Sequence, residues 1–99
     1  MPVTHDLKCL PAYYDAIKRG EKPFEVRRDD QGYQKGDFLR LNRWSIQRGY
    51  QEAHYWSGSY SKDAALPILA EVTFILTGGQ FGIEPGYIVM GIRVVEDAG

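Results

Sequence analysis

Several features of other protein classes are missing from this sequence. Its 99 residues include one cysteine, Cys9, which excludes an internal disulfide and a zinc site built from several thiolates. The two histidines show no paired ligand spacing with it, so we expect no metal site and no cofactor. No apolar run approaches the roughly 20 residues that cross a bilayer. Residues 1–6 also lack the basic start and apolar core of a secretory signal. We therefore expect a cytoplasmic protein without a membrane partner.

Net charge is also low, at −1, which does not by itself indicate a nucleic-acid-binding protein. The charges are nevertheless distributed unevenly along the chain. Residues 1–50 hold ten Lys and Arg against seven Asp and Glu, whereas residues 51–99 hold two against six. Any face that binds anions is therefore expected in the first half of the chain.

What the sequence does contain is typical of one small folded domain. Hydrophobic residues make up 43% and charged residues 25%, which is ordinary for a globular protein and unlike a disordered one. The length leaves no room for a second core, so residues 1–99 are expected to form a single domain. Eleven glycines and thirteen aromatic residues favour a turn-rich fold over a helical bundle.

Hydrophobic periodicity divides the chain into strands and one helix. Pro11 suits a first helical turn, and Gly20 after two basic residues suits a helix end, so a helix is predicted over residues 11–19. Alternating or β-branched patterns predict strands over residues 3–9, 24–27, 38–44, 68–77 and 87–95.

The last two predicted strands carry clear one-sided patterns. One face of residues 68–77 is expected to hold Ala70, Val72, Phe74 and Leu76, and one face of residues 87–95 is expected to hold Ile88, Met90, Ile92 and Val94. Residues 45–67 lack a clean period and are interpreted as a long aromatic-rich insertion with at most a frayed hairpin. Five or six mainly antiparallel strands with one or two short helices predict an α+β, mostly β fold, built as a small β-barrel or a curved sheet.

Residues 20–27, GEKPFEVR, form the most informative segment. Glu25 and Arg27 are two apart on a predicted strand, so their side chains share one face. Lys22 lies just before the strand, where Pro23 restricts the backbone. The three ionic side chains can therefore meet, with the cations holding an anion while the carboxylate fixes their geometry or moves a proton. A purely structural, salt-bridged strand face would have the same spacing.

This segment, together with Gly36-Asp37 ahead of the next strand, resembles the signature of the ASCH domain, a relative of the PUA barrel. In family form it reads Gly20-x-Lys22-x-x-Glu25-x-Arg27. The remainder resembles an ASCH branch of unknown function that is common in phages, prophages and bacteria. Apart from the middle loop, the resemblance covers nearly the whole chain through His5-x-Leu7-Lys8, Pro11-x-x-Tyr14, Asp30, Leu39-x-Leu41, Trp44, Val72-Thr73-x-Ile75-Leu76 and Gly86-Tyr87-x-x-Met90.

The resemblance implies a PUA-like β-barrel with a cleft, and RNA or a nucleotide as its ligand. Lys22 and Arg27 match the lysine and arginine of the family motif that lines this cleft. We therefore expect an RNA- or nucleotide-binding module in which Lys22 and Arg27 engage phosphate or base oxygens. Glu25 would orient the two cations.

A small metal-independent hydrolase is the alternative, with Lys22, Glu25 and Arg27 as its catalytic residues. Some ASCH relatives are acetylcytidine amidohydrolases, and others have been proposed as ribonucleases. Glu25 stands where the amidohydrolases have a threonine, and a glutamate cannot supply a hydroxyl nucleophile. For cleavage of an RNA phosphodiester, Glu25 would take the 2′-hydroxyl proton while Lys22 and Arg27 bind the phosphate.

Aromatic and basic residues are concentrated between residues 42 and 60, which include both tryptophans and three tyrosines. Unpaired bases stack on such rings with roughly 1–3 kcal/mol each, and arginine adds phosphate contacts. The same composition suits a cap over a small barrel, or an interface with a host protein partner of a phage protein. The expected nucleic-acid contacts outside residues 20–27 are Lys8, Arg28, Arg43, Trp44, Arg48, Tyr50 and Trp56.

Overall fold

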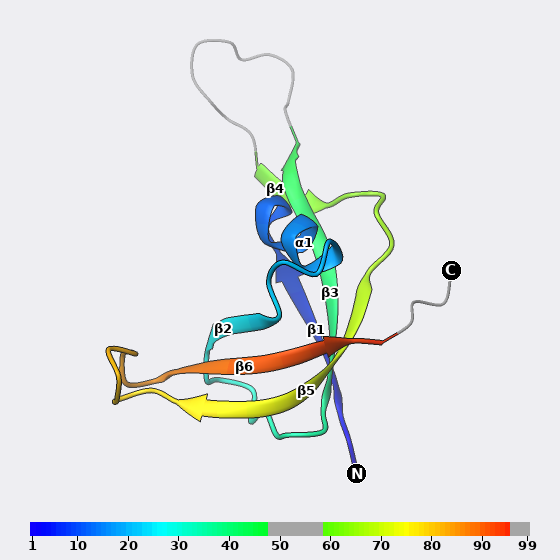
Figure 1. The fold of residues 1–99 in the computed structure, drawn as a ribbon. Helices are drawn as coiled ribbons and strands as arrows, with labels where there is room; N and C mark the ends of the chain where they lie inside the picture. The colour runs from blue at the N-terminus through cyan, green and yellow to red at the C-terminus, as the bar shows by residue number, and fades with distance from the viewer. Residues whose placement is uncertain (48–58, 96–99) are drawn as a thin grey trace, which may run out of the picture.

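A computed structural model, which describes residues 1–47 and 59–95, contains six strands and one helix (Figure 1). The chain order is β1 (Thr4–Cys9), α1 (Pro11–Lys18), β2 (Phe24–Arg28), β3 (Phe38–Gln47), β4 (Ser59–Lys62), β5 (Ile68–Thr77) and β6 (Tyr87–Val94). This confirms the predicted mostly-β class, and each predicted strand and the helix is present. In the described ranges α1 is the only helix, and with 8 residues it is far too short to cross a membrane.

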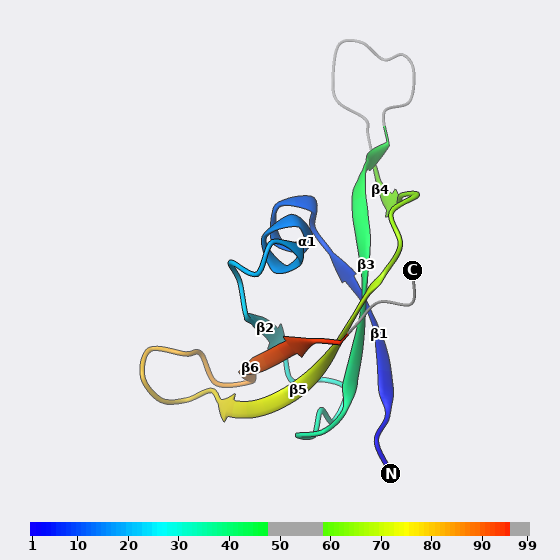
Figure 2. The same ribbon diagram turned by 45° about the vertical axis from the view of Figure 1, so that its right-hand side comes forward.

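The strands form one sheet in the order β1-β3-β5-β6-β2, with β4 paired to β3 beside this path. The β1–β3 pair is parallel and the other pairs are antiparallel, as the mainly antiparallel prediction requires. Strands β1 and β2 end the path, so in the described part of the chain the sheet curls without being closed by a ladder between them. Figures 1 and 2 show β1 and β3 running at a steep angle to β2 and β6, with α1 in the corner between the two directions.

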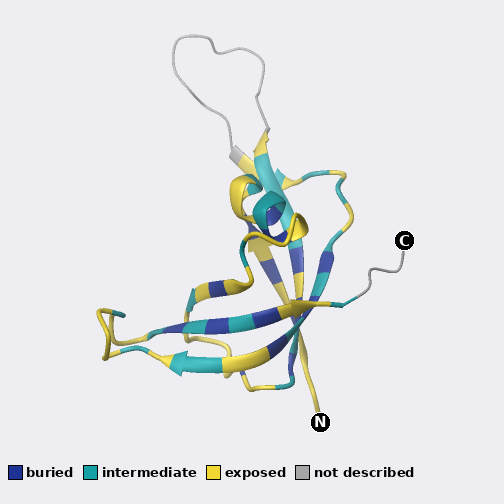
Figure 3. Cartoon of the chain, viewed as in Figure 1, coloured by how far each residue is buried: buried dark blue, intermediate teal, exposed yellow. Residues whose placement is uncertain are grey.

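The hydrophobic core lies on the concave side of this curled sheet. Alternate residues of the strands are buried, as the banding in Figure 3 shows. Helix α1 adds Tyr14 and Ile17, which are spaced for a single helical face and are both buried. The largest fully buried side chains are Ile17, Leu39, Leu41, Ile88, Met90 and Val72.

The predicted inward face of β6 is confirmed at Ile88, Met90 and Ile92, whereas Val94 at the strand end is 45% exposed. In β5 the predicted face is correct only as far as Val72. Phe74 is 61% exposed, so the expectation that it shares the face of Val72 is wrong.

A β-bulge explains this change of face in β5. The register with β6 shifts between Val72 and Phe74, and Thr73 is the additional residue. The neighbouring position on β6 is Gly91, where a Cβ atom would lie 3.2 Å from Thr73 Oγ1. Beyond the bulge Ile75 packs against the core in place of Phe74.

The predicted insertion contains a short hairpin at its base. Strand β3 extends to Gln47, three residues beyond the predicted end at Trp44, because β4 pairs with residues 44–47. Residues 48–58 lie outside the described part of the chain, so the predicted stacking loop is described only at its two ends.

Asp37 fastens the N-terminal strand to the turn before β3. Its buried carboxylate accepts hydrogen bonds from Val3 N–H (3.2 Å), Gln34 N–H (3.0 Å) and His5 Nε2 (2.8 Å). Burial disfavours ionisation, but these hydrogen bonds outweigh it and hold the pKa of Asp37 below its ordinary value. The Gly36-Asp37 pair singled out in the sequence is thus a structural turn, with Gly36 at a φ of 95°.

Acid should weaken the fold through Asp37. A lowered folded-state pKa stabilises the protein above the unfolded-state value of about 4, and this contribution is lost as pH falls through the folded-state pKa. We expect Asp37→Asn to lower the free energy of unfolding by about 2 kcal/mol at neutral pH. Urea unfolding at pH values from about 5 downward should show that the difference from wild type shrinks. A difference that is independent of pH would contradict this role.

Candidate cationic cleft

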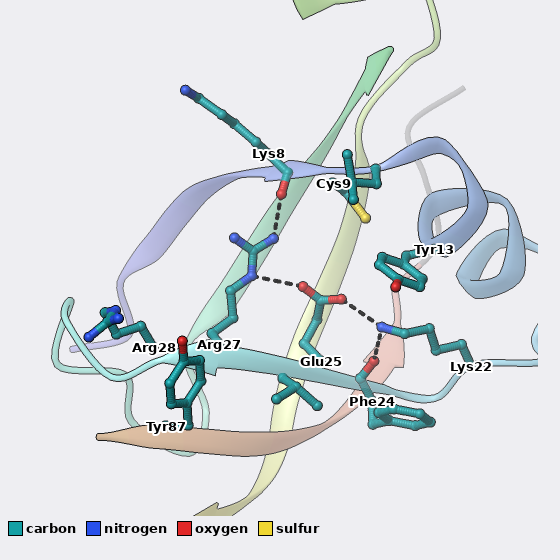
Figure 4. Close-up of a pocket in the computed structure, with 11 residues that line it drawn as sticks. Lys8, Cys9, Tyr13, Lys22, Phe24, Glu25, Arg27, Arg28 and Tyr87 are labelled. Carbon is teal, nitrogen blue, oxygen red and sulfur yellow. Dashed lines mark hydrogen bonds and ion pairs between the residues drawn. The ribbon is translucent and has the colours of Figure 1, made fainter. Parts of the chain in front are cut away.

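A cleft of about 670 Å³ opens between the end of β1, the start of α1 and strand β2 (Figure 4). It occupies the gap that the open sheet leaves between its two end strands. Its volume is within the usual range for small-molecule sites. The lining residues are Lys8, Cys9, Leu10, Tyr13, Lys22, Phe24, Glu25, Val26, Arg27, Arg28 and Tyr87.

Glu25 is the centre of this cleft, and its carboxylate is paired on both oxygens. Lys22 Nζ lies 2.9 Å from Oε1, and Arg27 Nε lies 3.0 Å from Oε2. The side chain of Glu25 is only 5% exposed, against 16% for Lys22 and 24% for Arg27. The three residues predicted from their spacing are therefore brought together, with the carboxylate beneath and the cations nearer to solvent.

Arg27 also spans the opening between the two end strands. Its Nη2 donates a hydrogen bond to the backbone carbonyl of Lys8 on β1, while its Nε is held by Glu25 on β2 (Figure 4). The remaining terminal nitrogen, Nη1, makes no hydrogen bond with residues 1–47 or 59–95. The guanidinium is thus fixed in place by two contacts and retains a donor for a ligand.

Aromatic rings line the cleft beside the cations. The ammonium group of Lys22 lies 5.1 Å from the ring centre of Tyr13 and 4.9 Å from that of Phe24. On the other side, the Arg28 guanidinium lies 5.3 Å from the ring centre of Tyr87. All three distances are within the range of cation–π attraction. None of these three aromatic residues was predicted as a ligand contact, although Tyr87 belongs to the family resemblance.

The cleft carries a strong local excess of positive charge. Four of its lining residues, Lys8, Lys22, Arg27 and Arg28, are cationic, and Glu25 is the single carboxylate among them. Lys8 and Arg28 have no carboxylate partner within the described ranges. Lys8 contributes its backbone to the cleft, since its side chain points away in Figure 4, so Lys22, Arg27 and Arg28 against Glu25 leave two excess positive charges there. In a chain with a net charge of −1 this local excess favours anions.

Cys9 contributes a thiol to the cleft wall, but one that is not activated. The residue is buried, and burial together with the nearby Glu25 carboxylate raises the pKa of the thiol to about 11. The group is therefore protonated at neutral pH, whereas nucleophilic cysteines need the thiolate.

Other predicted contacts lie away from the cleft. The Lys8 ammonium sits 4.4 Å from the Trp44 ring centre, which places Trp44 next to a cleft residue although it does not line the cleft. Arg48, Tyr50 and Trp56 fall outside the described residues. The protein-interface alternative for the aromatic segment rests mainly on the same part of the chain.

Arg43 has a structural environment. Its guanidinium pairs with Asp15 of α1 at 3.0 Å and with Asp63 at 2.6 Å, so it joins the helix to the segment after β4. The hydrogen bonds that Arg43 donates to both carboxylates raise its pKa further above its ordinary value, and the arginine lowers the pKa of Asp15. His5 likewise belongs to the Asp37 cluster, with its ring 4.7 Å from that of Tyr33, and it does not line the cleft.

No group of three or more His, Cys, Asp or Glu side chains suited to a metal ion occurs in residues 1–47 and 59–95. The cleft is lined by cationic, aromatic and aliphatic side chains, one carboxylate and the Cys9 thiol. Such a donor set suits a negatively charged ligand with a planar ring rather than a cation.

Comparison with known protein families identifies the chain. Residues 4–92 match a family described as "Domain of unknown function (DUF3850)". The chain belongs to this family. The DUF3850 match includes every residue that lines the cleft.

The DUF3850 chain is also similar to a phage protein. It is 36% identical over 44 residues to the "Uncharacterized 12.9 kDa protein in GpA 3'region" of Escherichia phage P2. The aligned part is 44% of this chain and 40% of the phage protein, so it spans less than half of the relative's length. The occurrence of a phage relative agrees with the phage and bacterial distribution that the sequence analysis expected.

Proposed function

We propose that this DUF3850 domain is a PUA-like module of the ASCH type that binds RNA or a nucleotide in its cleft. The observation that carries the proposal is the coincidence of two excess positive charges with three aromatic rings around one opening of about 670 Å³. Phosphate groups bind to the positive charges, and bases stack on the aromatic rings. A location in the cytoplasm, as expected from the sequence, is part of the proposal.

The contacts of each cleft residue indicate its role in binding. Arg27 offers Nη1 to a phosphate or base oxygen, while Glu25 and the Lys8 carbonyl hold the guanidinium in place. Lys8 and Arg28, which lack carboxylate partners in the described ranges, add charge at the sides. Tyr13 and Tyr87 supply faces on which a base can stack.

Binding is favoured over hydrolysis by the state of the possible catalytic groups. Each oxygen of Glu25 already accepts a hydrogen bond from a cation and its side chain is only 5% exposed, so a role as general base would require the carboxylate to become accessible to a substrate hydroxyl. The Cys9 thiol is protonated at neutral pH and is not a nucleophile. The same cleft can hold a ligand without either change.

RNA binding can be measured directly with a short fluorescent single-stranded RNA of mixed sequence. We expect wild-type affinity in the micromolar range or weaker, falling as salt rises, because released counterions contribute to binding. Arg28→Ala should reduce the slope of log affinity against log salt by about one, and Lys8→Ala should do the same if its ammonium contacts phosphate. Fluorescence anisotropy over a salt series gives both quantities.

Arg40→Ala is the matched control, because Arg40 is an arginine on β3 that pairs with Asp6 at 2.8 Å and does not line the cleft. It should leave both affinity and salt slope unchanged. Lys22→Ala and Arg27→Ala should also weaken binding, with circular dichroism to verify that each variant is folded. Wild-type levels of binding in all four cleft variants would rule the proposal out.

A further inference from the structure

Strand β2 has one edge that pairs with no other strand in the described part of the chain, and that edge faces the cleft. Its other edge pairs with β6, where Ile92 N–H donates to Pro23 C=O at 3.1 Å and Asp29 N–H donates to Gly86 C=O at 2.8 Å. Because hydrogen-bonded pairs alternate along an antiparallel ladder, the backbone groups of Glu25 and Arg27 also point toward β6. Those of the three residues between and beside them, Phe24, Val26 and Arg28, point away from β6.

Most of the carbonyl groups on this free edge are already in use. The Phe24 carbonyl accepts a hydrogen bond from Lys22 Nζ at 2.8 Å, and the Arg28 carbonyl accepts one from Asp30 N–H at 2.9 Å. Within residues 1–47 and 59–95, neither the N–H nor the C=O of Val26 has a hydrogen-bond partner. A single residue is too short a stretch for the addition of a peptide strand, which needs a run of alternate free residues.

We propose that the backbone N–H and C=O of Val26 bind the Watson–Crick edge of one unpaired nucleobase. This inference rests on the proposed function and specifies that the cleft recognises the hydrogen-bonding edge of a base. One donor and one acceptor on the same side of a strand match the edge of a base, where a donor and an acceptor are adjacent in adenine, cytosine, guanine and uracil alike. Such edges are free in single-stranded RNA and are the usual targets of proteins that bind it.

The side chains on either side of Val26 are suited to the two faces of a base in that position. Successive side chains of a strand point to opposite faces, so Glu25 and Arg27 lie on one side of the strand plane and Phe24 and Arg28 lie on the other. The guanidinium of Arg27 is held in place by hydrogen bonds to Glu25 and to the Lys8 carbonyl. Guanidinium groups and aromatic rings both stack on bases.

Recognition through a backbone donor and acceptor has a specific consequence. It does not distinguish the four bases strongly, but it requires the base to be unpaired, since a partner base in a duplex occupies the same edge. The domain should therefore prefer single-stranded over double-stranded RNA at equal phosphate charge.

Modified RNA tests the inference with the wild-type domain. Oligouridylate is compared with its N3-methyluridine analogue, and oligoadenylate with its N6,N6-dimethyladenosine analogue, because methylation removes the donor of the edge without changing the charge. We expect about tenfold weaker binding of each methylated oligomer, the usual effect of losing a two-point base contact. An oligomer of abasic sugar-phosphate units should bind more weakly still, because it loses the stacking of its bases as well as the edge contact.

Val26→Pro removes the same contact from the protein side. Proline lacks the N–H group and is tolerated in an edge strand where that group is outside the ladder. We expect about tenfold weaker binding of oligouridylate and unchanged binding of the abasic oligomer. Val26→Ala, which keeps the N–H, is the control and should bind like wild type. A semisynthetic chain with an ester in place of the amide at residue 26 makes the same test if the proline variant does not fold.

The outcomes separate this inference from the proposed function. Equal affinity for the parent and methylated oligomers would overturn the role of Val26 and leave RNA binding by the cleft intact. Absence of binding to every RNA by the wild-type domain would overturn both.

Discussion

Replacing Glu25 with alanine is expected to lower the free energy of unfolding by about 3 kcal/mol. The reason is that Glu25 is the buried member of the ionic cluster, and its removal leaves Lys22 and Arg27 close together without a counter-charge. The loss lies at the lower end of the range for broken buried pairs, because both cations retain some exposure to solvent. Arg27 would also lose one of the two contacts that fix it across the opening of the sheet. Urea unfolding followed by tryptophan fluorescence measures the change.

Glu21→Ala is the matched control for this experiment. Glu21 forms a pair of similar length with Arg19, at 2.9 Å, but both side chains are more than half exposed. Its loss should leave stability unchanged, because exposed pairs contribute little. Glu25→Gln should fall between wild type and Glu25→Ala, since the amide oxygen still accepts a hydrogen bond. If Glu25→Ala were as stable as wild type, the cluster would not contribute to the fold.

A second large effect is expected at Gly78, the first residue after β5. A Cβ atom at this position would lie 2.0 Å from the Glu84 carbonyl oxygen and 2.5 Å from the Tyr87 carbonyl oxygen. Both are backbone atoms, so no rotation of a side chain relieves the overlap. Gly78→Ala must move the connection from β5 to β6, and we expect a loss of about 3 kcal/mol in the free energy of unfolding.

The Gly78→Ala substitution should also disturb the structure of the cleft. Gly78 N–H donates to the Tyr87 carbonyl at 2.7 Å, and Tyr87 lines the cleft beside Arg28. Gly82→Ala, in the same connection, is the control. No atom lies within 4 Å of its added Cβ, so only its positive φ of 80° matters, at about 1 kcal/mol. Similar losses in the two variants would show that the close approach at Gly78 is relieved by a small local shift.

Much of this fold is predictable from the sequence because its signals are local. Pro11 and Gly20 mark the two ends of α1, and alternation marks the strands. The bulge at Thr73 is different, since the alternating pattern of residues 68–77 continues through it unchanged. The bulge lies against Gly91 of the neighbouring strand, which has no side chain there, and this contact depends on a pairing that the sequence does not specify.

In the candidate site, too, some residues could be predicted from local sequence and others could not. Spacing alone placed Glu25 and Arg27 on one face, because both lie on the same short strand. Tyr87 reaches the cleft only through the register of β2 with β6, which pairs it with Arg28 from a distant part of the chain. Arg43 shows the opposite case: its basic and aromatic neighbours suggested a ligand contact, but tertiary packing supplies it with carboxylates 28 and 20 residues away.

The open sheet has a mechanical consequence for the entrance to the cleft. Neighbouring strands inside a sheet are held at a fixed separation of about 4.8 Å by a cooperative row of backbone hydrogen bonds. Between β1 and β2 the distance is instead governed by the reach of the Arg27 side chain to the Lys8 carbonyl. A long side chain can release such a contact by rotating about its own bonds. The entrance of the cleft can therefore widen for a larger ligand while every paired strand keeps its backbone hydrogen bonds.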